Sequence, residues 1–499
     1  MISNDEGIIS LEYRVMEEVC KLAWEKNLNE ETKEQLANQI IPGHKPEFRC
    51  CVYKEREIVR QRIRLACGEN VTAHSDSNNV VQVINAACDA CPISAYTVTD
   101  NCRICMGKAC LNSCHFDAIS KGPIRMHIDA QKCKECGLCA KACPYGSIVH
   151  LERPCKKACP VGAITYDEDG LCKIDEGKCI RCGHCIHACP FGAIGSKAFL
   201  VNIIKDILAG KEVIAMCAPS IEGQYGDNIT MASIKSALIK MGFADMVEVG
   251  LGGDMTAAYE AEEWIEAYKE GKKMTTSCCP AFTNMQRKHF PEVYKNNTST
   301  TVSPMCAISR YLKLTHPGCV TVFIGPCVAK KSEIMDPSLP NNANYVMTFE
   351  ELRSLMHSKD IKFEENEGDY QESSVWGKRF ASSGGVANAV IECMQERGED
   401  TSEIKLLRSA GGAECKKTLL LLQNGKLQED FVEGMICPGG CVGGPSRRKT
   451  EAEVTKARIA LLAKADKRKV LENLEKYPMS EFSMHRDKEP IDSNETKEI

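Results

Sequence analysis

The chain has no excess of either charge and no long apolar run. Its 499 residues include 63 Lys and Arg against 68 Asp and Glu, a formal net charge of -5, so the charge balance does not favour a nucleic acid or an anionic membrane as partner. No stretch approaches the roughly 18 apolar residues of a membrane-spanning helix. The N-terminal MISNDEGIISLEYRVMEE lacks the basic and apolar regions of a signal peptide. We therefore expect a cytoplasmic protein with no nucleic-acid and no membrane partner.

Cysteine, in contrast, is abundant. The chain has 31 cysteines, most of them in groups with short spacing. In a cytosolic protein this pattern favours metal binding over a disulfide framework. Redox metal chemistry is the leading hypothesis, in a chain long enough for two to four domains of about 100–200 residues each.

The pattern of residues changes three times along the chain. Residues 1–85 have charged sequence with a helical period and predict a helical N-terminal segment. Residues 86–197 repeat one phrase, as CHFDAI, CPYGSI, CPVGAI and CPFGAI, which predicts two tandem ferredoxin-like α+β units. Residues 198–450 alternate helix and strand patterns, as expected of an α/β domain with parallel sheets. Residues 451–499 predict a helix and then, from Ser483, a polar and disordered tail without visible chemistry.

Two runs of cysteine have the spacing C-x2-C-x2-C-x3-C-P of bacterial ferredoxins, in which the fourth cysteine ligates the other cluster of a pair. They are formed by Cys133, Cys136, Cys139 and Cys143 before Pro144, and by Cys179, Cys182, Cys185 and Cys189 before Pro190. Because each run fixes five positions, the spacing predicts two 4Fe-4S cubanes rather than zinc or free thiols.

A third run, at Cys102, Cys105, Cys110 and Cys114, has two extra residues in its middle gap. Exchange of fourth ligands predicts one cluster on Cys102, Cys105, Cys110 and Cys143, and a second on Cys133, Cys136, Cys139 and Cys114. A third cluster then joins Cys159 to Cys179, Cys182 and Cys185. Such a series is useful for moving single electrons between a surface docking site and a reaction centre further along the chain.

Two cysteines of this region, Cys155 and Cys189, are left as half of a fourth site. Cys88 and Cys91 could complete it. The alternative is a degenerate repeat that holds no metal, in which Cys88 and Cys91 are packing residues. The cysteines without ligand spacing are expected to be ordinary thiols: Cys20, Cys50, Cys51, Cys67, Cys172, Cys217, Cys306, Cys319, Cys393 and Cys415.

Three cysteine-bearing loops stand out in the α/β region: TTSCCPAF at 275–282, FIGPCVAKKSE at 323–333 and EGMICPGGCVGGPS at 433–446. Two of them follow strand-like runs, which places their cysteines at strand carboxyl ends, where open α/β sheets bind ligands. One thiolate from each of the first two loops and two from the third suffice for a cubane. The glycines of PGGCVGG allow a close approach of the backbone to a bulky cofactor.

These loops resemble the signature segments of FeFe-hydrogenases, TSCCP, PC-x2-K-x2-E and C-x3-C, in the same order. The resemblance covers most of residues 200–450. It implies an H-cluster, a 4Fe-4S cubane joined to a diiron subsite with carbon monoxide, cyanide and azadithiolate ligands. The implied cubane ligands are Cys279, Cys327, Cys437 and Cys441, with Cys441 bridging to the diiron subsite, and Cys278 is the implied proton-shuttling thiol.

The same resemblance assigns roles to residues around the diiron subsite. Lys330 serves one cyanide, Pro219 and Ser220 contact the other, and Met435 is an apolar wall residue. Protons are implied to pass through Glu260, Glu263 and Ser299; the three-residue spacing puts both glutamates on one helical face. For the glutamates the alternative is a solvated face in an acidic stretch.

The implied activity is the reversible interconversion of H2 with two protons and two electrons in an anaerobic setting. The implied partners are ferredoxin or a similar one-electron carrier, and the hydrogenase maturation machinery. One alternative is a noncatalytic iron-only hydrogenase-like protein, and another is an H2 sensor, although no PAS-like or kinase segment is evident. Gly325, Phe282 and Met305 stand where the family often has methionine, tryptophan and glutamine, and such neighbours tune a metal site.

Overall fold

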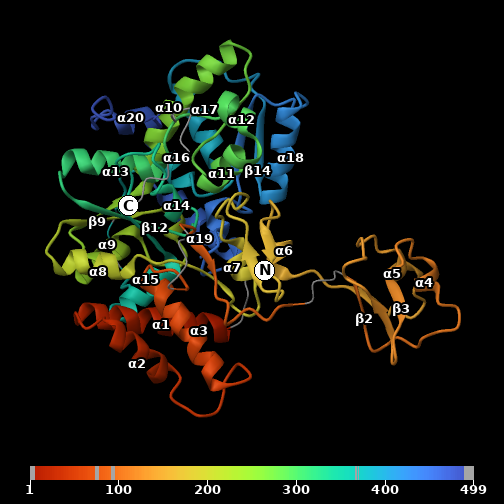
Figure 1. Cartoon of the computed structure of the whole chain (residues 1–499). Coiled ribbons are helices and arrows are strands. Elements are labelled where there is room, and N and C mark those ends of the chain that lie inside the picture. The colour runs from red at the N-terminus through yellow and green to blue at the C-terminus, as the bar shows by residue number, and fades with distance from the viewer. Residues whose placement is uncertain (1–5, 73–77, 92–95, 366–367, 369, 488–499) are drawn as a thin grey trace.

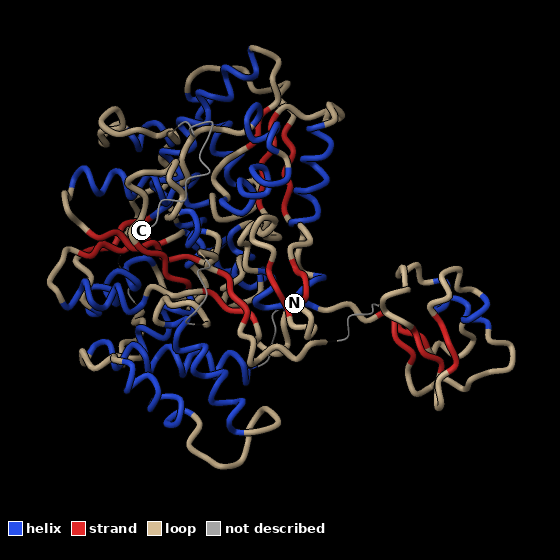
Figure 2. Tube along the Cα trace, in the orientation of Figure 1, coloured by secondary structure: helices blue, strands red, loops and turns tan. Residues whose placement is uncertain are grey.

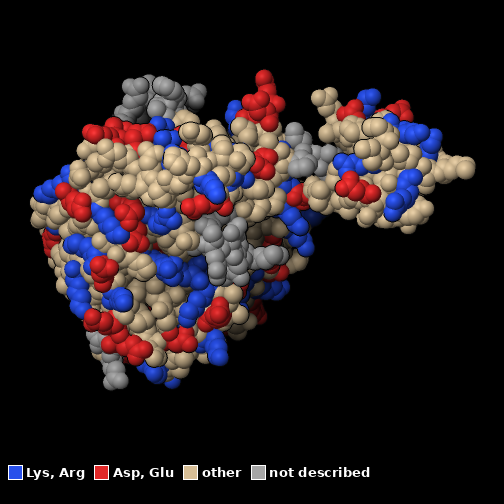
Figure 3. Space-filling view, turned by 90° about the horizontal axis from the view of Figure 1, so that it is seen from below, with Lys and Arg blue, Asp and Glu red and all other residues tan. Residues whose placement is uncertain are grey.

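The computed structural model describes residues 6–72, 78–91, 96–365, 368 and 370–487. Figure 1 shows a large body that contains most of the chain and a small unit, residues 96–150, that projects away from it. The same unit stands apart from the body when the molecule is seen from below, in Figure 3. Within the described ranges, no helix is both long enough and apolar enough to cross a bilayer.

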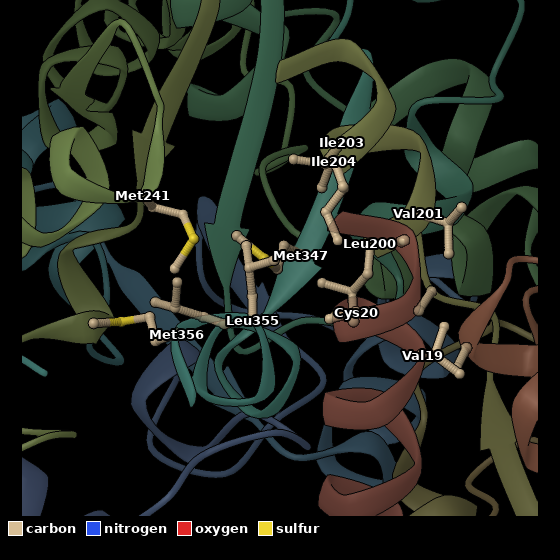
Figure 4. Packing of buried hydrophobic residues seen from close by; sticks show 14 of the residues in the cluster. Val19, Cys20, Leu200, Val201, Ile203, Ile204, Met241, Met347, Leu355 and Met356 are labelled. Atoms are coloured by element: carbon tan, nitrogen blue, oxygen red, sulfur yellow. The ribbon is translucent and has the colours of Figure 1, made fainter. Parts of the chain in front are cut away.

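The N-terminal segment forms three helices, α1 (Glu6–Trp24), α2 (Glu30–Ile40) and α3 (Val52–Ala66). The apolar face of α1 packs onto the body: Val19 and Cys20 are buried in the same cluster as Leu200 and Met347 (Figure 4). Burial of a side chain such as valine or leucine contributes roughly 1.5–3 kcal/mol. The helical segment is therefore part of the α/β core rather than a separate domain.

The unit at residues 96–150, called the inserted unit below, has short antiparallel strand pairs beside short helices (Figure 2). Strand β2 pairs with β5 and strand β3 pairs with β4, both antiparallel. Tyr96 lies opposite His150, so the chain enters and leaves this unit side by side. Its elements are β2 (Tyr96–Val98), α4 (Ala109–Asn112), β3 (Ile119–Lys121), β4 (Met126–Ile128), α5 (Leu138–Ala142) and β5 (Ile148–His150).

The second ferredoxin-like unit is assembled from two stretches, residues 80–91 and 153–197, and is called the split unit below. Strand β1 pairs antiparallel with β8, although β1 lies within the segment that we predicted to be helical. From the sequence we expected the two units to follow each other in tandem. In the structure, the inserted unit interrupts the split unit. The elements of the split unit are β1 (Val81–Val83), α6 (Pro154–Lys157), β6 (Ile164–Tyr166), β7 (Cys172–Ile174), α7 (His184–Ala188) and β8 (Ile194–Ser196).

The first sheet of the α/β region is parallel, with the strand order β10-β9-β12-β13. Its two central strands are buried along their whole length, as expected of a parallel sheet covered on both faces. One apolar cluster joins the sheet to α8, α9 and α15, and a second joins it to α10 and α13. These elements are α8 (Leu200–Leu208), β9 (Val213–Cys217), α9 (Met231–Met241), β10 (Asp245–Glu248), α10 (Val249–Lys269), α13 (Pro304–Thr315), β12 (Val320–Gly325), α14 (Lys330–Glu333), β13 (Tyr345–Thr348) and α15 (Phe349–His357).

A second parallel sheet has the order β11-β15-β14. Its apolar cluster includes Phe282, Leu419 and Val432, and the thiols of the split unit pack against the same cluster. The fold class predicted from the sequence, parallel sheets flanked by helices after ferredoxin-like units, is confirmed. The elements around this sheet are β11 (Met274–Thr275), α11 (Pro280–His289), α12 (Pro291–Asn297), α16 (Val375–Arg379), α17 (Gly385–Glu396), β14 (Leu406–Ala410), α18 (Gly412–Gln423) and β15 (Phe431–Met435).

Helices α10 and α13 approach each other closely at Gly252. A Cβ at this position would lie 2.2 Å from the carbonyl oxygen of Pro304, so only glycine fits. This contact fixes α10, the helix that contains Glu260 and Glu263, against the first turn of α13.

The C-terminal region is more ordered than we predicted. The expected single helix is two, α19 (Glu451–Lys464) and α20 (Val470–Leu474). Further on, the backbone runs alongside residues 300–302: the amide of Val302 donates to Met484 O at 2.8 Å and the amide of Arg486 donates to Thr300 O at 2.9 Å. The predicted disorder is wrong for these residues because Met484 is buried. The remainder of the predicted tail, residues 488–499, lies outside the described residues.

Candidate active site

The three cysteine loops leave the carboxyl ends of strands in both sheets. β11 is followed by Cys278 and Cys279, β12 by Cys327, and β15 by Cys437. Strand β9 of the first sheet ends just before a 3-10 turn, Pro219–Ile221. Parallel strands place such loops together at one edge, so two sheets supply one site.

The four thiols implied as cubane ligands meet there. Burial raises the pKa of the Cys327 thiol, and its neighbours Cys279 and Cys441 raise it further. Burial likewise raises the pKa of Cys437, which is close to Cys327, Cys279 and Cys441. As whole residues, Cys279, Cys327 and Cys437 are nonetheless only partly buried and Cys441 is exposed.

The donor set fits a cubane. Four converging thiols are the usual ligands of a 4Fe-4S cluster, and Cys279 caps the N-terminus of α11, where the helix dipole favours negative charge. Among the described residues, no group of three or more His, Cys, Asp or Glu is arranged to hold a single metal ion. The two findings agree, because a cubane takes its four ligands at four separate iron atoms.

The glycines of PGGCVGG have a different role from the one expected. A Cβ at Gly440 would lie 2.6 Å from the backbone nitrogen of Ser383, and one at Gly443 would lie 2.0 Å from the carbonyl oxygen of Pro438. These close approaches are to the chain itself. The glycines therefore shape the loop that presents Cys437 and Cys441.

The residues implied as cyanide partners lie beside the thiols. The Lys330 ammonium donates to Ser303 Oγ at 2.7 Å, approaches Cys278 O at 3.5 Å and pairs with Glu333 at 2.5 Å. Ser220 is fully buried, and its hydroxyl has no hydrogen-bond partner in the part of the chain that the structure describes. An unpaired buried hydroxyl costs free energy, so this position fits a ligand that accepts a hydrogen bond there.

Met435 and Pro219 are both buried and complete this part of the site. Pro219 is held by a residue that the sequence did not single out: Arg458, on α19, is 1% exposed and donates to the Pro219 carbonyl. Arg458 also pairs with Glu222 at 2.9 Å. A lone arginine in a helical pattern gives no sequence signal for this contact.

Cys278 and Glu260 are buried next to each other. Burial raises the pKa of the Cys278 thiol well above its usual value, and the Glu260 charge raises it further. Burial raises the pKa of Glu260 to about 8, and one of its oxygens accepts from the Ser277 amide at 3.1 Å. At neutral pH both groups therefore carry a proton.

Polar side chains continue from Glu260 toward the surface, and Ser299, Glu263, Thr300 and His485 are joined by short polar contacts. The Ser299 hydroxyl donates to Glu263 at 2.5 Å and also stabilises the Glu260 carboxylate. Burial raises the pKa of Glu263, but hydrogen bonds from His485, Ser299 and Thr300 outweigh it, so its pKa is below the usual value. Two carboxyl groups whose environments drive their pKa values apart are typical of acid–base sites.

His485 is at the outer end of this line, and the sequence analysis missed it. Its Nδ1 lies 2.8 Å from the Thr300 hydroxyl and 3.4 Å from Glu263, and its side chain is 44% exposed. The segment that we expected to be a tail without visible chemistry therefore contacts the implied proton route at this residue. No sequence signal could find it, since His485 follows Glu263 by more than 200 residues.

The split unit places the predicted relay ligands against the catalytic loops. Cys159, Cys179 and Cys182 pack against the same apolar cluster as Cys279 and Cys327. Burial raises the pKa of Cys182 to about 12, with Cys179, Cys159 and Cys279 as nearby thiols. Cys185 is close to Cys182, Cys179 and Cys159. The four ligands predicted for the third cluster are thus together.

The inserted unit brings its predicted ligands together as well. Cys102, Cys105, Cys110 and Cys143, the first predicted set, line one cavity. Burial raises the pKa of Cys139, and Cys133 and Cys136 are nearby. Cys114 packs in the same cluster as Cys139.

Comparison with known proteins gives the family. The family described as the iron only hydrogenase large subunit, C-terminal domain, matches residues 211–445. Residues 211–445 therefore form an iron-only hydrogenase C-terminal domain. A 4Fe-4S dicluster domain also matches residues 153–193 of the chain, and a 4Fe-4S binding domain matches residues 125–148. The chain therefore has 4Fe-4S regions and the domain that holds the H-cluster.

The relatives are distant. Iron hydrogenase 1 of Clostridium pasteurianum is 28% identical over 409 residues, covering 69% of this chain and 70% of that protein. The nuclear prelamin A recognition factor of Homo sapiens is 23% identical over 293 residues, covering 48% of this chain and 64% of that protein. A solved apo FeFe-hydrogenase from Chlamydomonas reinhardtii is 22% identical with a TM-score of 0.44, covering 54% of this chain and 92% of that one.

At the positions that depart from the hydrogenase pattern, the available space is filled by side chains. A Cβ at Gly325 would lie 2.5 Å from the ring of Phe323, and one at Gly434 would lie 2.1 Å from the ring of Phe282. Met305 is fully buried. The surroundings of the thiols are therefore packed, although with different residues.

Proposed function

We propose that this protein is an FeFe-hydrogenase that interconverts H2 with protons and electrons. Electrons would pass through the cubanes to or from ferredoxin or a similar one-electron carrier. One observation carries the proposal: Cys278 is close both to the implied cubane ligands Cys279 and Cys441 and to Glu260. Beyond Glu260, Ser299, Glu263 and His485 extend to the surface.

The H-cluster, when bound, supplies the iron at which the bond between two hydrogen atoms is made or cleaved. The chain would hold its cubane through Cys279, Cys327, Cys437 and Cys441. Lys330 and Ser220 would donate hydrogen bonds to its cyanide ligands, and Met435 would keep water out. In such a dry place each unpaired polar group would cost about 1–3 kcal/mol.

The proton route follows from the pKa order of its members. Cys278 keeps its proton at neutral pH because burial raises its pKa, so its thiol can carry a proton to or from the site. Glu260, with a pKa of about 8, exchanges protons with less cost than a carboxyl of ordinary pKa. Ser299 passes the proton on to Glu263, and His485 exchanges it with solvent.

The electron route enters from the split unit. Cys182 is near both Cys279 and Cys437, so the cluster on Cys159, Cys179, Cys182 and Cys185 would be next to the H-cluster cubane. The inserted unit, which stands apart from the body in Figure 1, would receive electrons from the carrier.

A noncatalytic relative is the second candidate, because one relative, the nuclear prelamin A recognition factor, is not named as a hydrogenase. The buried route from Cys278 to His485 supports catalysis, since a structural protein has no use for a chain of buried acids. Burial of a carboxyl group lowers the free energy of unfolding unless the group is hydrogen-bonded or paired, so such groups are uncommon without a functional reason.

Infrared spectroscopy separates the two candidates. The protein would be produced with and without the hydrogenase maturation enzymes. We expect carbon monoxide and cyanide bands only after maturation. A matured protein that contains its cubanes but shows no such bands would be a noncatalytic relative.

A further inference from the structure

The split unit lacks half of a ligand run in its continuous sequence. The dicluster match begins at residue 153, and ahead of the Cys179 run it contains Cys155 and Cys159 at ligand spacing, with Cys172 apart from them. A complete first run needs two more cysteines ahead of Cys155. In sequence, the preceding stretch belongs instead to the inserted unit.

The strand pairing brings another stretch into that place. In the inserted unit, β2 comes just before Cys102 and Cys105 and pairs with β5, which comes just after Cys143. In the split unit, β1 comes just before Cys88 and Cys91. It pairs with β8, which comes just after Cys189. In both units, therefore, a pair of strands brings the first two cysteines, spaced C-x2-C, toward the last cysteine.

The thiols are also placed alike. The amide of Ala193 donates to Cys189 Sγ at 3.4 Å, as the amide of Ser147 donates to Cys143 Sγ at 3.4 Å. Cys88 Sγ accepts from the amide of Cys172 at 3.3 Å. Amide hydrogen bonds to ligand sulfur are one of the features that tune iron–sulfur clusters.

Cys88, Cys91, Cys155 and Cys189 lie close to one another. Burial raises the pKa of Cys91, and the Cys155 and Cys88 thiols are among the groups near it. Burial also raises the pKa of Cys189, again with Cys155 and Cys88 nearby. Cys155 is buried in the apolar cluster against which Cys88 packs.

We propose that Cys88, Cys91, Cys155 and Cys189 hold a fourth relay 4Fe-4S cluster, whose second and third ligands are separated in sequence by the whole inserted unit. Because Tyr96 and His150 are paired where the chain enters and leaves that unit, the insertion needs no rearrangement of the split unit. Domains with adjacent ends are readily inserted into others.

The placement makes this cluster the link between the two units. Cys91 directly precedes the stretch that leads into the inserted unit. On the other side, Cys155 is near Cys185, a ligand of the cluster beside the catalytic loops. Electrons that enter at the inserted unit would thus reach the catalytic region through the fourth cluster.

Cys172 is the nearest competing thiol, and the register of the strands argues against it as a ligand. It lies opposite Tyr166 in the β6–β7 pair, as Met126 lies opposite Lys121 in the β3–β4 pair. Met126 is a buried core residue. Cys172 therefore occupies an apolar strand position. Because its thiol also contacts Cys155, its substitution is the stringent test of whether it is a ligand.

The test is iron and acid-labile sulfide analysis of the full chain, made without maturation enzymes and reconstituted anaerobically, so it is independent of hydrogenase activity. With four relay cubanes and one H-cluster cubane, the unaltered chain should contain about 20 iron atoms, against about 16 with three relay cubanes. A count near 16 at full sulfide loading would overturn the proposal.

Substitutions locate the site. The double variant Cys88→Ala, Cys91→Ala should lose about four iron atoms and one reduced-cluster spin in electron paramagnetic resonance, whereas Cys172→Ala should lose none. Unchanged iron in the double variant, or an equal loss in the Cys172 variant, would contradict the assignment. Should the double variant not fold, the iron count of the unaltered chain decides.

Discussion

The His184 ring nitrogen Nε2 lies 3.5 Å from Cys437 Sγ. His184 begins α7 of the split unit and Cys437 belongs to the catalytic loop after β15, so this contact joins the relay to the reaction centre. Burial lowers the pKa of His184 to about 4. The imidazole is therefore neutral near pH 7, and its single N–H can donate to a cluster thiolate.

Replacement of His184 should shift the potential of the H-cluster cubane. A hydrogen bond to ligand sulfur stabilises the more negative, reduced cluster, so His184→Ala should lower the potential, by on the order of 60 mV for a tenfold change in the reduction equilibrium. Redox titration followed by electron paramagnetic resonance measures this. His187→Ala, on the same helix, is the control; equal shifts in both variants would rule out a specific contact.

The Glu260 carboxyl should titrate with a midpoint of about pH 8. Burial disfavours the charged form, so the group is protonated below that pH and ionised above it. Infrared difference spectra should show a protonated carboxyl band that disappears as the pH rises through the midpoint, and Glu260→Gln should remove it. Glu262→Gln, at an exposed glutamate paired with Arg397, should leave it unchanged. A band lost near pH 4.5 would contradict the route.

His485 should act as the exchange point with solvent. His485→Ala should reduce turnover at least about tenfold, less than the 10²–10⁴ of a group at the reacting atoms, because water can partly replace it. Added imidazole should restore much of the rate. Ser299→Ala interrupts the route inside the protein, where imidazole cannot reach, and should not be rescued. Rescue of neither variant, or of both, would argue against His485 as the outer end.

The inserted unit should bind an acidic electron carrier. It has seven Lys and Arg against four Asp and Glu within a chain of net charge -5. Its Cys136 is exposed, and so are Lys132 and Lys134, which precede it in the chain. Salt should therefore raise the KM for an acidic ferredoxin, because it screens the attraction, and leave turnover with methyl viologen unchanged.

Charge reversal tests the same surface. Lys132→Glu with Lys134→Glu should raise the KM for ferredoxin severalfold and weaken its dependence on salt. Lys417→Glu with Lys426→Glu, at two exposed positions on the body, changes the net charge equally and is the matched control. If the control raises the KM equally, the effect comes from net charge rather than from docking at the inserted unit.

The features that the sequence predicted best are encoded in short stretches. The spacing of Cys133 to Cys143 and of Cys179 to Cys189 is local, and the strands before Cys278 and Cys327 are visible as strand-like runs. A parallel sheet then brings loops from distant strands to one edge. The placement of the first two cysteine loops at one edge therefore followed from local patterns and a general rule of the fold, whereas the choice of the four cubane ligands came from the family resemblance.

The features that it missed depend on contacts between distant stretches. The pairing of β1 with β8 joins residues separated by the whole inserted unit. A strand of three residues is too short for its sequence to predict which strand it pairs with. Arg458 and His485 reach the site from the C-terminal region through single side-chain contacts. Periodicity predicts which face of a helix is buried, but not which polar side chain enters a distant site.

H2 turnover by the matured protein and by its Cys278→Ala variant tests the central proposal most directly. With reduced methyl viologen, the matured protein should evolve H2, and the variant should lose about 10³-fold in rate while it keeps its carbon monoxide and cyanide bands. Cys393→Ala, at a thiol buried in the same apolar cluster, should retain the parent rate. A matured protein without turnover, or a Cys278 variant close to the parent's rate, would contradict the account.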